Sequence, residues 1–174
     1  VQSGSNAVLK KMQRKYTREI YLEKVDELHS YRPDIALCTD VIVGFPGETE
    51  ENFEQTMDLL ETVRFHGSFS FKYSDRPHTR SADFSDKVDE QVKKKRLQRF
   101  QSRQDAISLE RNQEFLGKAV KVMVESNSSS GTQGRTGTNH IVHFTAPTEL
   151  RPGDCTHVTI THAGQHSLKG EPTA

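Results

Sequence analysis

Apolar positions in the first part of the chain switch between helical and extended spacing. Tyr21, Val25 and Leu28 follow the i, i+4, i+7 spacing of one helix face, and Thr17 before them is suited to cap that helix. A nearly continuous apolar run follows at residues 35–43, which is typical of a strand buried on both faces of a parallel sheet. The pattern therefore predicts a helix and then a buried parallel strand.

A second helix and a second strand repeat this order. Thr49 is the expected N-cap of the helix. The apolar face of the helix comprises Phe53, Met57, Leu60 and Val63. Phe69, Phe71 and Tyr73 then alternate through a strand, and residues 86–113 form a long polar helix. Helices alternating with buried strands predict a parallel α/β sheet or barrel, although two strands alone cannot close a barrel.

The last third of the chain consists of short extended segments instead. A run of valines at alternate positions opens it, residues 141–144 and 155–161 are also extended, and a Ser/Gly/Asn loop is expected over 126–134. Short strands at this spacing are typical of a small antiparallel barrel. The sequence therefore predicts two domains, residues 1–113 and residues 114–174.

Composition removes several classes of function. Lys and Arg number 24 and so do Asp and Glu, so any binding to nucleic acid must come from a local patch rather than from net charge. No apolar run approaches the roughly 20 residues that a membrane span requires, and no basic-then-apolar leader opens the chain. We therefore expect a cytoplasmic protein without a membrane partner, with Cys38 and Cys155 as reduced thiols.

Two features of the first domain are candidates for ligand chemistry. The turn Gly44–Gly47 follows a strand and precedes a helix, which is where parallel α/β folds place their ligands. An ordinary tight turn is an equally good interpretation of these glycines. Asp40 is an acid within an apolar strand, so it must find partners or carry a shifted pKa, and we favour a functional role over a loop-capping one.

Three further patterns carry weaker signals. The segment Arg135-Thr136-Gly137-Thr138-Asn139 joins two expected strands, and its guanidinium, hydroxyl and amide groups suit RNA, although a polar hairpin explains them too. The basic helix at 93–103 could follow a phosphate backbone, but a solvated face is the commoner interpretation. The eight histidines lack paired cysteines or an acid cluster, so we expect surface histidines and no metal site.

Taken in order, several segments resemble the radical-SAM methylthiotransferases over essentially the whole chain. These segments are Val1–Ser5, Met12–Thr17, Asp34–Thr49, Phe71–Pro77, Val92–Leu97, Gly134–Thr136 with Asn139, and Ser167–Glu171. The resemblance implies the C-terminal part of a radical-SAM (βα) barrel followed by a small antiparallel TRAM β-barrel, a domain that binds RNA. Within the family, the chain most resembles the enzymes that add a methylthio group at C2 of an N(6)-isopentenyl-type adenosine next to the tRNA anticodon.

The resemblance also implies cofactors, partners and sites. The family uses S-adenosylmethionine and two [4Fe-4S] clusters, and its substrate is the anticodon stem-loop of tRNA. The residues implied to shape the S-adenosylmethionine pocket are Gln2, Ser3, Arg14, Asp40, Gly44, Pro46 and Gly47. Those implied to face RNA are Arg135, Thr136 and Asn139.

Three features of the sequence change the expectation for this chain. The clusters require sets of three cysteines, whereas Cys38 and Cys155 stand alone, so we expect the chain by itself to hold neither cluster and to be inactive. Without the cluster that anchors it, S-adenosylmethionine should bind this chain weakly or not at all. The chain also opens without Met, as a C-terminal portion of a longer enzyme would. His78-Thr79-Arg80 stands where Gly-Thr-Pro is expected, which weakens the role implied for that loop.

Other functions stay open at this point. Sister enzymes modify threonylcarbamoyl-adenosine in tRNA or an aspartate of a ribosomal protein, and the sequence separates the first of these poorly. A non-catalytic RNA-binding module is the alternative from another class, because the cysteine count of the chain fits it. The oligomeric state is not predicted.

Overall fold

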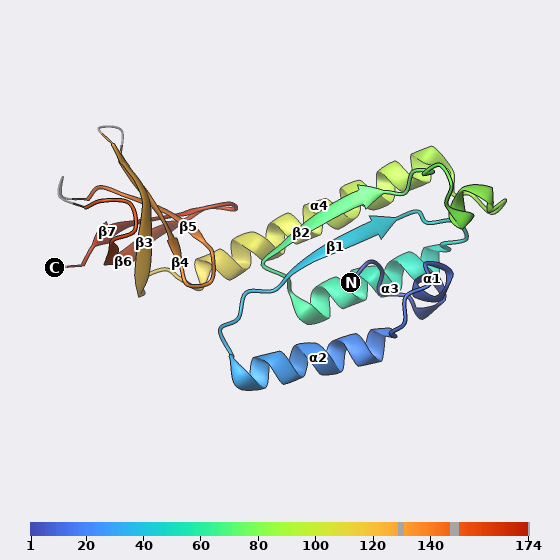
Figure 1. Ribbon diagram of the computed structural model, residues 1–174, viewed down its shortest axis with the longest axis horizontal. Helices are drawn as coiled ribbons and strands as arrows, with labels where there is room; N and C mark the ends of the chain where they lie inside the picture. The colour runs from blue at the N-terminus through green and yellow to red at the C-terminus, as the bar shows by residue number, and fades with distance from the viewer. Residues whose placement is uncertain (129–130, 147–149, 174) are drawn as a thin grey trace. The chain divides into compact units, whose positions relative to one another are not determined.

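The computed structural model describes residues 1–128, 131–146 and 150–173, and it divides into two compact units (Figure 1). Unit 1 is Val1–Asp105 and unit 2 is Ala106–Ala174. The division falls inside the last helix of unit 1, earlier than the join expected between 113 and 114. The two domain ranges inferred from the sequence therefore stay a prediction.

Unit 1 consists of helices and one small parallel sheet. Its elements are α1 (Asn6–Lys11), α2 (Arg18–Tyr31), β1 (Cys38–Val43), α3 (Glu50–Val63), β2 (Gly67–Lys72), the 3₁₀ turn η1 (Arg80–Asp83) and the start of α4 (Glu90–Gln113). β1 and β2 lie side by side and point the same way (Figure 1), with Cys38 opposite Gly67 and Val43 opposite Lys72. The expected parallel pairing of these two strands is confirmed.

Local capping explains where two of these helices begin. Thr17 accepts a hydrogen bond from the Ile20 backbone N–H at 3.4 Å and caps α2. Thr49 and Asn52 form a reciprocal capping box at α3, each side chain accepting from the other's backbone N–H at 3.2 and 3.1 Å. Both caps predicted from the sequence are confirmed.

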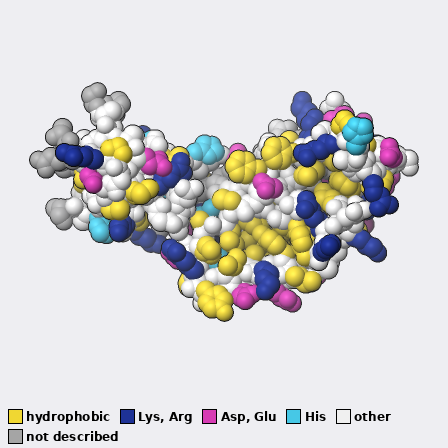
Figure 2. All heavy atoms as spheres, viewed as in Figure 1, with side chains coloured by type: hydrophobic (Ala, Val, Ile, Leu, Met, Phe, Trp, Pro, Cys, Tyr) yellow, Lys and Arg dark blue, Asp and Glu magenta, His cyan; other side chains and the backbone are white. Residues whose placement is uncertain are grey.

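The two faces of the β1–β2 sheet differ in burial. Val41 and Val43 are buried on one face, whereas Phe69 and Phe71 on the other face are 68% and 56% exposed. Figure 2 shows hydrophobic side chains gathered on unit 1 among Lys and Arg side chains. The prediction that the strand within residues 35–43 is buried on both faces is wrong, because the described elements cover one face of β1 only.

Asp40 lies on the uncovered face. It pairs in register with Phe69 and is exposed. Alternate strand residues point to opposite faces, so the position of Asp40 between buried Thr39 and Val41 sends its carboxylate outward. The expectation of a buried carboxylate at this position is therefore corrected.

Unit 2 is a closed barrel with the strand order β3-β4-β5-β7-β6. Its strands are β3 (Ala119–Ser128), β4 (Gly131–Thr136), β5 (Ile141–Phe144), β6 (Cys155–Ala163) and β7 (Leu168–Pro172). The core of the barrel comprises Val122, Val124, Val142, Phe144, Val158, Ile160 and Leu168. A small barrel was expected here and is found.

Two details of the barrel differ from the expectation. β5 and β7 pair in parallel, so the barrel is mixed rather than wholly antiparallel. The loop expected over 126–134 is largely strand, because β3 runs to Ser128 and β4 begins at Gly131, and residues 129–130 lie outside the described residues. Ser, Asn and Gly have low strand propensity, but pairing with the neighbouring strand outweighs it here.

None of the helices in the described ranges has the length and apolar character that a membrane span requires.

Candidate functional site

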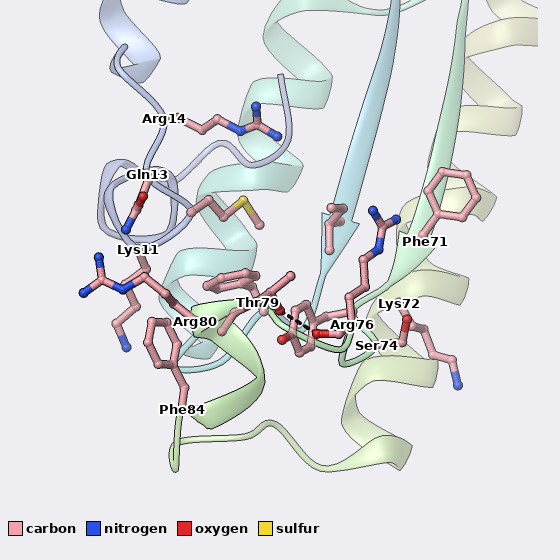
Figure 3. A pocket seen from close by; sticks show the side chains of 15 residues that line it. Lys11, Gln13, Arg14, Phe71, Lys72, Ser74, Arg76, Thr79, Arg80 and Phe84 are labelled. Atoms are coloured by element: carbon pink, nitrogen blue, oxygen red, sulfur yellow. Dashed lines mark hydrogen bonds between the residues drawn. The ribbon is translucent and has the colours of Figure 1, made fainter.

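A cavity of about 460 Å³ lies in unit 1 where β1 and β2 end (Figure 3). Its lining comes from the end of α1 and the loop after it, from the ends of the strands, and from the loop between β2 and α4. The lining residues are Lys11, Met12, Gln13, Arg14, Ile42, Phe45, Phe71, Lys72, Tyr73, Ser74, Arg76, Thr79, Arg80, Ser81 and Phe84. The carboxyl ends of parallel strands are where α/β folds bind ligands, so the position itself favours a binding site.

Among the residues that the structure describes, five cationic side chains and no carboxylate line the cavity. Two of them are already neutralised, since Lys11 binds Asp86 at 2.5 Å and Lys72 binds Glu90 at 3.1 Å. The Lys11 ammonium holds the pKa of Asp86 below its usual range. The other three cations are arginines, and this lining can hold an anionic group.

Aromatic side chains form the apolar part of the cavity. Phe45 and Tyr73 meet edge to face with ring centroids 5.0 Å apart, and Phe84 meets Phe45 at 6.4 Å. Phe45 and Tyr73 are buried together with Val8, and Met12 and Ile42 pack against them. Flat apolar rings beside cations suit a ligand that has both a planar ring and a negative charge.

The turn Gly44–Gly47 uses its backbone within the protein. The Gly44 N–H donates to the buried Glu48 carboxylate at 2.8 Å, and the Gly47 N–H donates to the Asp86 carbonyl at 2.7 Å. Gly44 has φ +71°, and a Cβ there would lie 2.3 Å from Cγ of Lys93. These contacts explain the glycines by packing, so a cofactor role for Gly44, Pro46 and Gly47 stays a prediction.

Of the residues expected near the cofactor, Arg14 lines the cavity and the other six do not. The Gln2 side chain accepts a hydrogen bond from the Tyr16 hydroxyl at 2.8 Å. Ser3 is fully buried, with its hydroxyl 3.3 Å from that of Thr56. The structure thus brings only one predicted residue to the cavity. Arg76 and Arg80 line it as well, and the departure at residues 78–80 was the signal in the sequence that drew attention to their loop.

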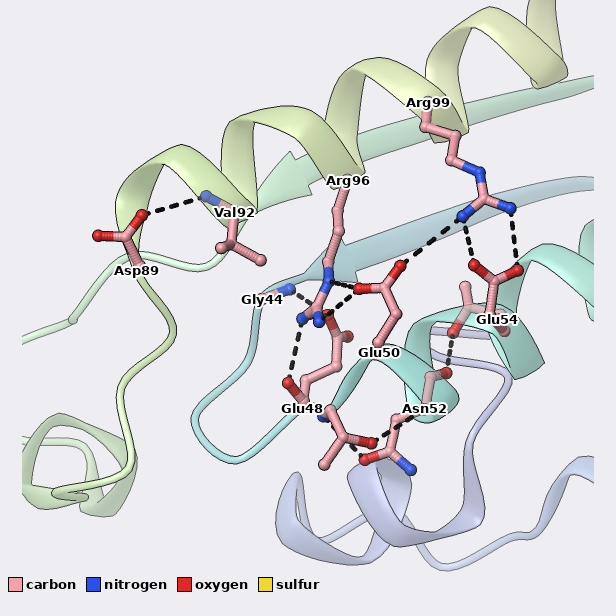
Figure 4. Close-up of polar contacts among 11 residues, drawn as sticks. Gly44, Glu48, Glu50, Asn52, Glu54, Asp89, Val92, Arg96 and Arg99 are labelled. Carbon is pink, nitrogen blue, oxygen red and sulfur yellow. Dashed lines mark hydrogen bonds and ion pairs between the residues drawn. The ribbon is translucent and has the colours of Figure 1, made fainter.

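Charges on α4 are matched by acids of α3 and of the turn before it (Figure 4). The buried Arg96 guanidinium donates to Glu48 and Glu50 at 2.9 Å each. Farther along, Arg99 binds Glu54 and Arg103 binds Glu61. These ion pairs count against a phosphate track for the three arginines. The solvated-face interpretation fits the exposed Lys94, Lys95 and Arg99, whereas Arg96 is buried.

Glu48 is the most constrained acid in this network. Its side chain is 1% exposed, and burial raises the pKa of Glu48 although the Gly44 N–H and Arg96 oppose that shift. The ion pair with Arg96 therefore stabilises a carboxylate that the interior disfavours. Because Glu48 and Arg96 bind each other, they fix the turn to α4 rather than acting on a ligand.

The hairpin between β4 and β5 brings together the residues expected to face RNA. Arg135 donates to Glu125 at 2.7 Å and to the Asn139 side chain at 3.1 Å. The Thr136 hydroxyl accepts from the backbone N–H of His140 at 3.1 Å. Arg135, Thr136 and Asn139 are therefore pre-organised in one turn, and contact with RNA stays a prediction for all three.

His140 packs against an aromatic ring of unit 2. It lies 4.7 Å from the Phe115 ring, and its Nδ1 is 2.9 Å from the Thr138 hydroxyl. Burial lowers the pKa of His140, and the charge on Arg111 adds to this. Across the described part of the chain, no group of three or more His, Cys, Asp or Glu side chains is placed to hold a metal ion.

Comparison with known proteins adds evidence that geometry cannot give. Residues 1–60 match the family model of the Radical SAM superfamily. The chain is 58% identical over 170 residues to the tRNA-2-methylthio-N(6)-dimethylallyladenosine synthase of Desulfotalea psychrophila, covering 98% of this chain and 38% of that protein. Proteins of the same name from Syntrophobacter fumaroxidans and Thermoanaerobacter pseudethanolicus are 51% and 48% identical, with 98% of this chain and 38% and 37% of their own length covered.

The chain thus spans less than two fifths of the length of these curated relatives. The matches run over nearly the whole chain, and all three relatives carry the same name. The resemblance to radical-SAM methylthiotransferases is confirmed, and these relatives carry the name of the dimethylallyladenosine type that the sequence indicated.

Proposed function

We propose that this chain is the C-terminal part of a tRNA methylthiotransferase that adds a methylthio group at C2 of an N(6)-dimethylallyl-type adenosine next to the anticodon. The observation that carries the proposal is the 58% identity, over 98% of this chain, with a synthase of that name. The shared name favours this substrate over threonylcarbamoyl-adenosine in tRNA and over a ribosomal-protein aspartate.

In this proposal, unit 1 supplies the last two strands of a partial radical-SAM barrel. The match of residues 1–60 to that superfamily and the parallel pairing of β1 with β2 support it. The exposed Phe69 and Phe71 support it too, because further strands of a barrel would cover this face. Asp40 would then point into the barrel interior rather than into solvent.

The cavity fits part of S-adenosylmethionine. The Arg14 guanidinium suits the carboxylate of that molecule, and the rings of Phe45, Tyr73 and Phe84 suit a purine. The two [4Fe-4S] clusters do not fit the residues of this chain, which has two cysteines far apart in sequence. The cofactor and the clusters supply the radical chemistry in the parent enzyme, and this chain contributes binding and orientation.

Unit 2 is proposed to act as a TRAM domain that holds the anticodon stem-loop. A small closed barrel with a polar, pre-organised hairpin supports this role. Guanidinium, hydroxyl and amide groups on a loop are suited to phosphates and to the edges of unpaired bases. Arg135, Thr136 and Asn139 are the residues expected to make these contacts.

Substitution of Arg135 tests the role of the hairpin. We expect R135A to weaken binding of an anticodon stem-loop RNA about tenfold, because one charge-assisted contact is lost. Fluorescence anisotropy with a labelled RNA measures the affinity, and circular dichroism checks the fold. K121A removes an exposed cation from β3 and is the matched control. Unchanged affinity in a folded R135A protein would contradict the assignment.

A further inference from the structure

Unpaired guanidinium groups are concentrated at the cavity of unit 1. Arg14, Arg76 and Arg80 line it, and within the described ranges none of their side chains has a hydrogen bond or an ion pair. Elsewhere in unit 1, several arginines each bind a carboxylate: Arg18, Arg32, Arg96, Arg99 and Arg103. The chain has no net charge, so an uncompensated cluster at one cavity marks a place that an anion can occupy.

Two of these arginines come from the loop between β2 and α4. In Figure 3, Arg76 reaches toward the strand ends and Arg14 reaches in from the opposite side, whereas Arg80 lies on the same side as Lys11. Arg76 and Arg80 are exposed, so they stand at the rim of the cavity rather than on its floor. From the rim, both side chains can contact a ligand that extends beyond the cavity.

The loop that carries them is held in one shape. The Thr79 hydroxyl donates to the Arg76 carbonyl at 2.8 Å, and the Lys87 ammonium donates to the carbonyls of Ser81 and Ala82 at 2.8 and 2.9 Å. Lys87 also binds Asp75, which removes the nearest acid of the loop from competition. Side chains on a fixed loop bind with less loss of conformational entropy than those on a free one.

The turn of this loop is made by a residue in an unusual conformation. His78 has φ +65°, which non-glycine residues rarely adopt, and it lies midway between the two arginines. His78 thus lies at the turn, with Arg76 before it and Arg80 after it. Strain of this kind persists where the surrounding structure fixes it, and it is common at ligand sites.

We propose that Arg76 and Arg80 each bind a different backbone phosphate of the substrate RNA, on two sides of the cavity rim. The paired N–H donors of a guanidinium match the oxygens of a phosphate, and neither guanidinium is bound to a carboxylate of the described residues. Exposure at the rim favours a phosphate of a large ligand over a group that must be enclosed. This inference rests on the proposed function, because it takes RNA as the partner of the chain.

Salt-dependent RNA affinity tests the inference. A fluorescein-labelled RNA hairpin with an anticodon stem-loop sequence is titrated with the wild-type chain, R76A and R80A at several KCl concentrations. Each variant is expected to lose about tenfold in affinity and to flatten the slope of log affinity against log salt by about 0.7, as one lost phosphate contact would. R80K keeps the charge without the fork, so it should lose less affinity than R80A.

The matched control is R32A, and circular dichroism verifies folding. Arg32 is exposed and is already paired with Asp34 at 3.2 Å, so its loss should leave RNA affinity unchanged. If an alanine variant does not fold, R76Q or R80Q replaces it. Wild-type affinity and slope in folded R76A and R80A would overturn the inference.

Three further outcomes separate this inference from the proposed function. If R135A weakens binding while R76A and R80A do not, unit 2 binds RNA and only the role of the rim arginines is wrong. If the wild-type chain binds no RNA hairpin, both the RNA role of the chain and this inference fail. If R76A and R80A instead reduce calorimetric binding of S-adenosylmethionine and leave RNA affinity intact, the two arginines serve the cofactor and the inference is overturned.

Discussion

Buried charge is the main feature of unit 1 at the scale of single residues. Arg96 and Glu48 are 7% and 1% exposed, and Glu50 adds a second carboxylate to the same guanidinium. Removing two charges from water is unfavourable, and only close pairing compensates for it. The pair therefore fixes α4 against the turn after β1 and so shapes the wall beside the cavity.

Loss of Arg96 should be strongly destabilising. We expect R96M to lower the free energy of unfolding by about 3–5 kcal/mol, because Glu48 would remain buried without its partner. Urea denaturation followed by circular dichroism measures the change. R99M is the matched control on the same helix, since Arg99 also binds a carboxylate but is 51% exposed, and we expect it to lose about 0–1 kcal/mol. Equal losses in the two variants would contradict the burial argument.

His140 should make the stability of unit 2 depend on pH. Burial lowers its pKa in the folded chain below the ordinary value of 6.5, so the unfolded chain binds a proton more readily. Stability is then full above pH 6.5 and falls as the pH drops from 6.5 through the folded pKa. Urea midpoints measured across this range should show a fall that H140Q reduces. H157Q, at an exposed histidine, should leave the fall unchanged.

Individual residues show why the sequence predicted part of the site. Thr17 and Thr49 were found because a cap depends on the next three residues, which are visible in the sequence. The partners of Arg96 lie 46 and 48 positions away and could not be read from local pattern. Asp40 was misjudged because its burial depends on which elements cover the sheet, not on its apolar neighbours.

At the scale of elements, the barrel depends on close approach of β3 and β4. A Cβ at Gly134 would lie 2.4 Å from the Met123 carbonyl oxygen and 2.5 Å from Cγ1 of Val122. Real side chains do not approach a backbone oxygen this closely, so the strands would have to separate. Gly134 is thus required by packing between two strands rather than by its own backbone angles.

Substitution of Gly134 tests this packing. We expect G134A to lower the free energy of unfolding of unit 2 by about 1–3 kcal/mol, as overpacking in a tight interior does. G137A is the control in the same unit, because no atom of the described residues lies within 4 Å of a Cβ there. Thermal melts followed by circular dichroism compare the two. A G134A protein as stable as G137A would show that β3 and β4 can separate without loss.

The elements themselves were predicted better than their pairing. The helices and most strands follow from periodicity, because hydrophobic spacing reports which face is buried. The parallel pairing of β5 with β7 could not be predicted, since it joins segments separated by β6 in the chain. Likewise the sequence located the Gly44–Gly47 turn, and it marked residues 78–80 as a departure from the family pattern. That Arg76 and Arg80 line the cavity depends on tertiary structure and could not be predicted.

At the scale of the whole molecule, a chain of zero net charge carries a local excess of positive charge. Most arginines of unit 1 are neutralised by carboxylates, which leaves the unpaired ones at the end of the sheet. Because the net charge is zero, the overall field of the protein does not attract RNA, so the proposed RNA binding would depend on local groups at this cavity and in unit 2. Affinity for RNA should accordingly be modest and sensitive to salt.

The central claim is that this chain is the C-terminal part of a tRNA methylthiotransferase. The most direct test replaces the corresponding segment of the Desulfotalea psychrophila synthase with this chain and expresses the chimera in cells that lack their own synthase. Mass spectrometry of tRNA nucleosides then measures 2-methylthio-N(6)-dimethylallyladenosine against its unmodified precursor. We predict that the chimera restores the methylthio nucleoside. A folded chimera that holds its iron–sulfur clusters but leaves only the precursor in tRNA would contradict the claim.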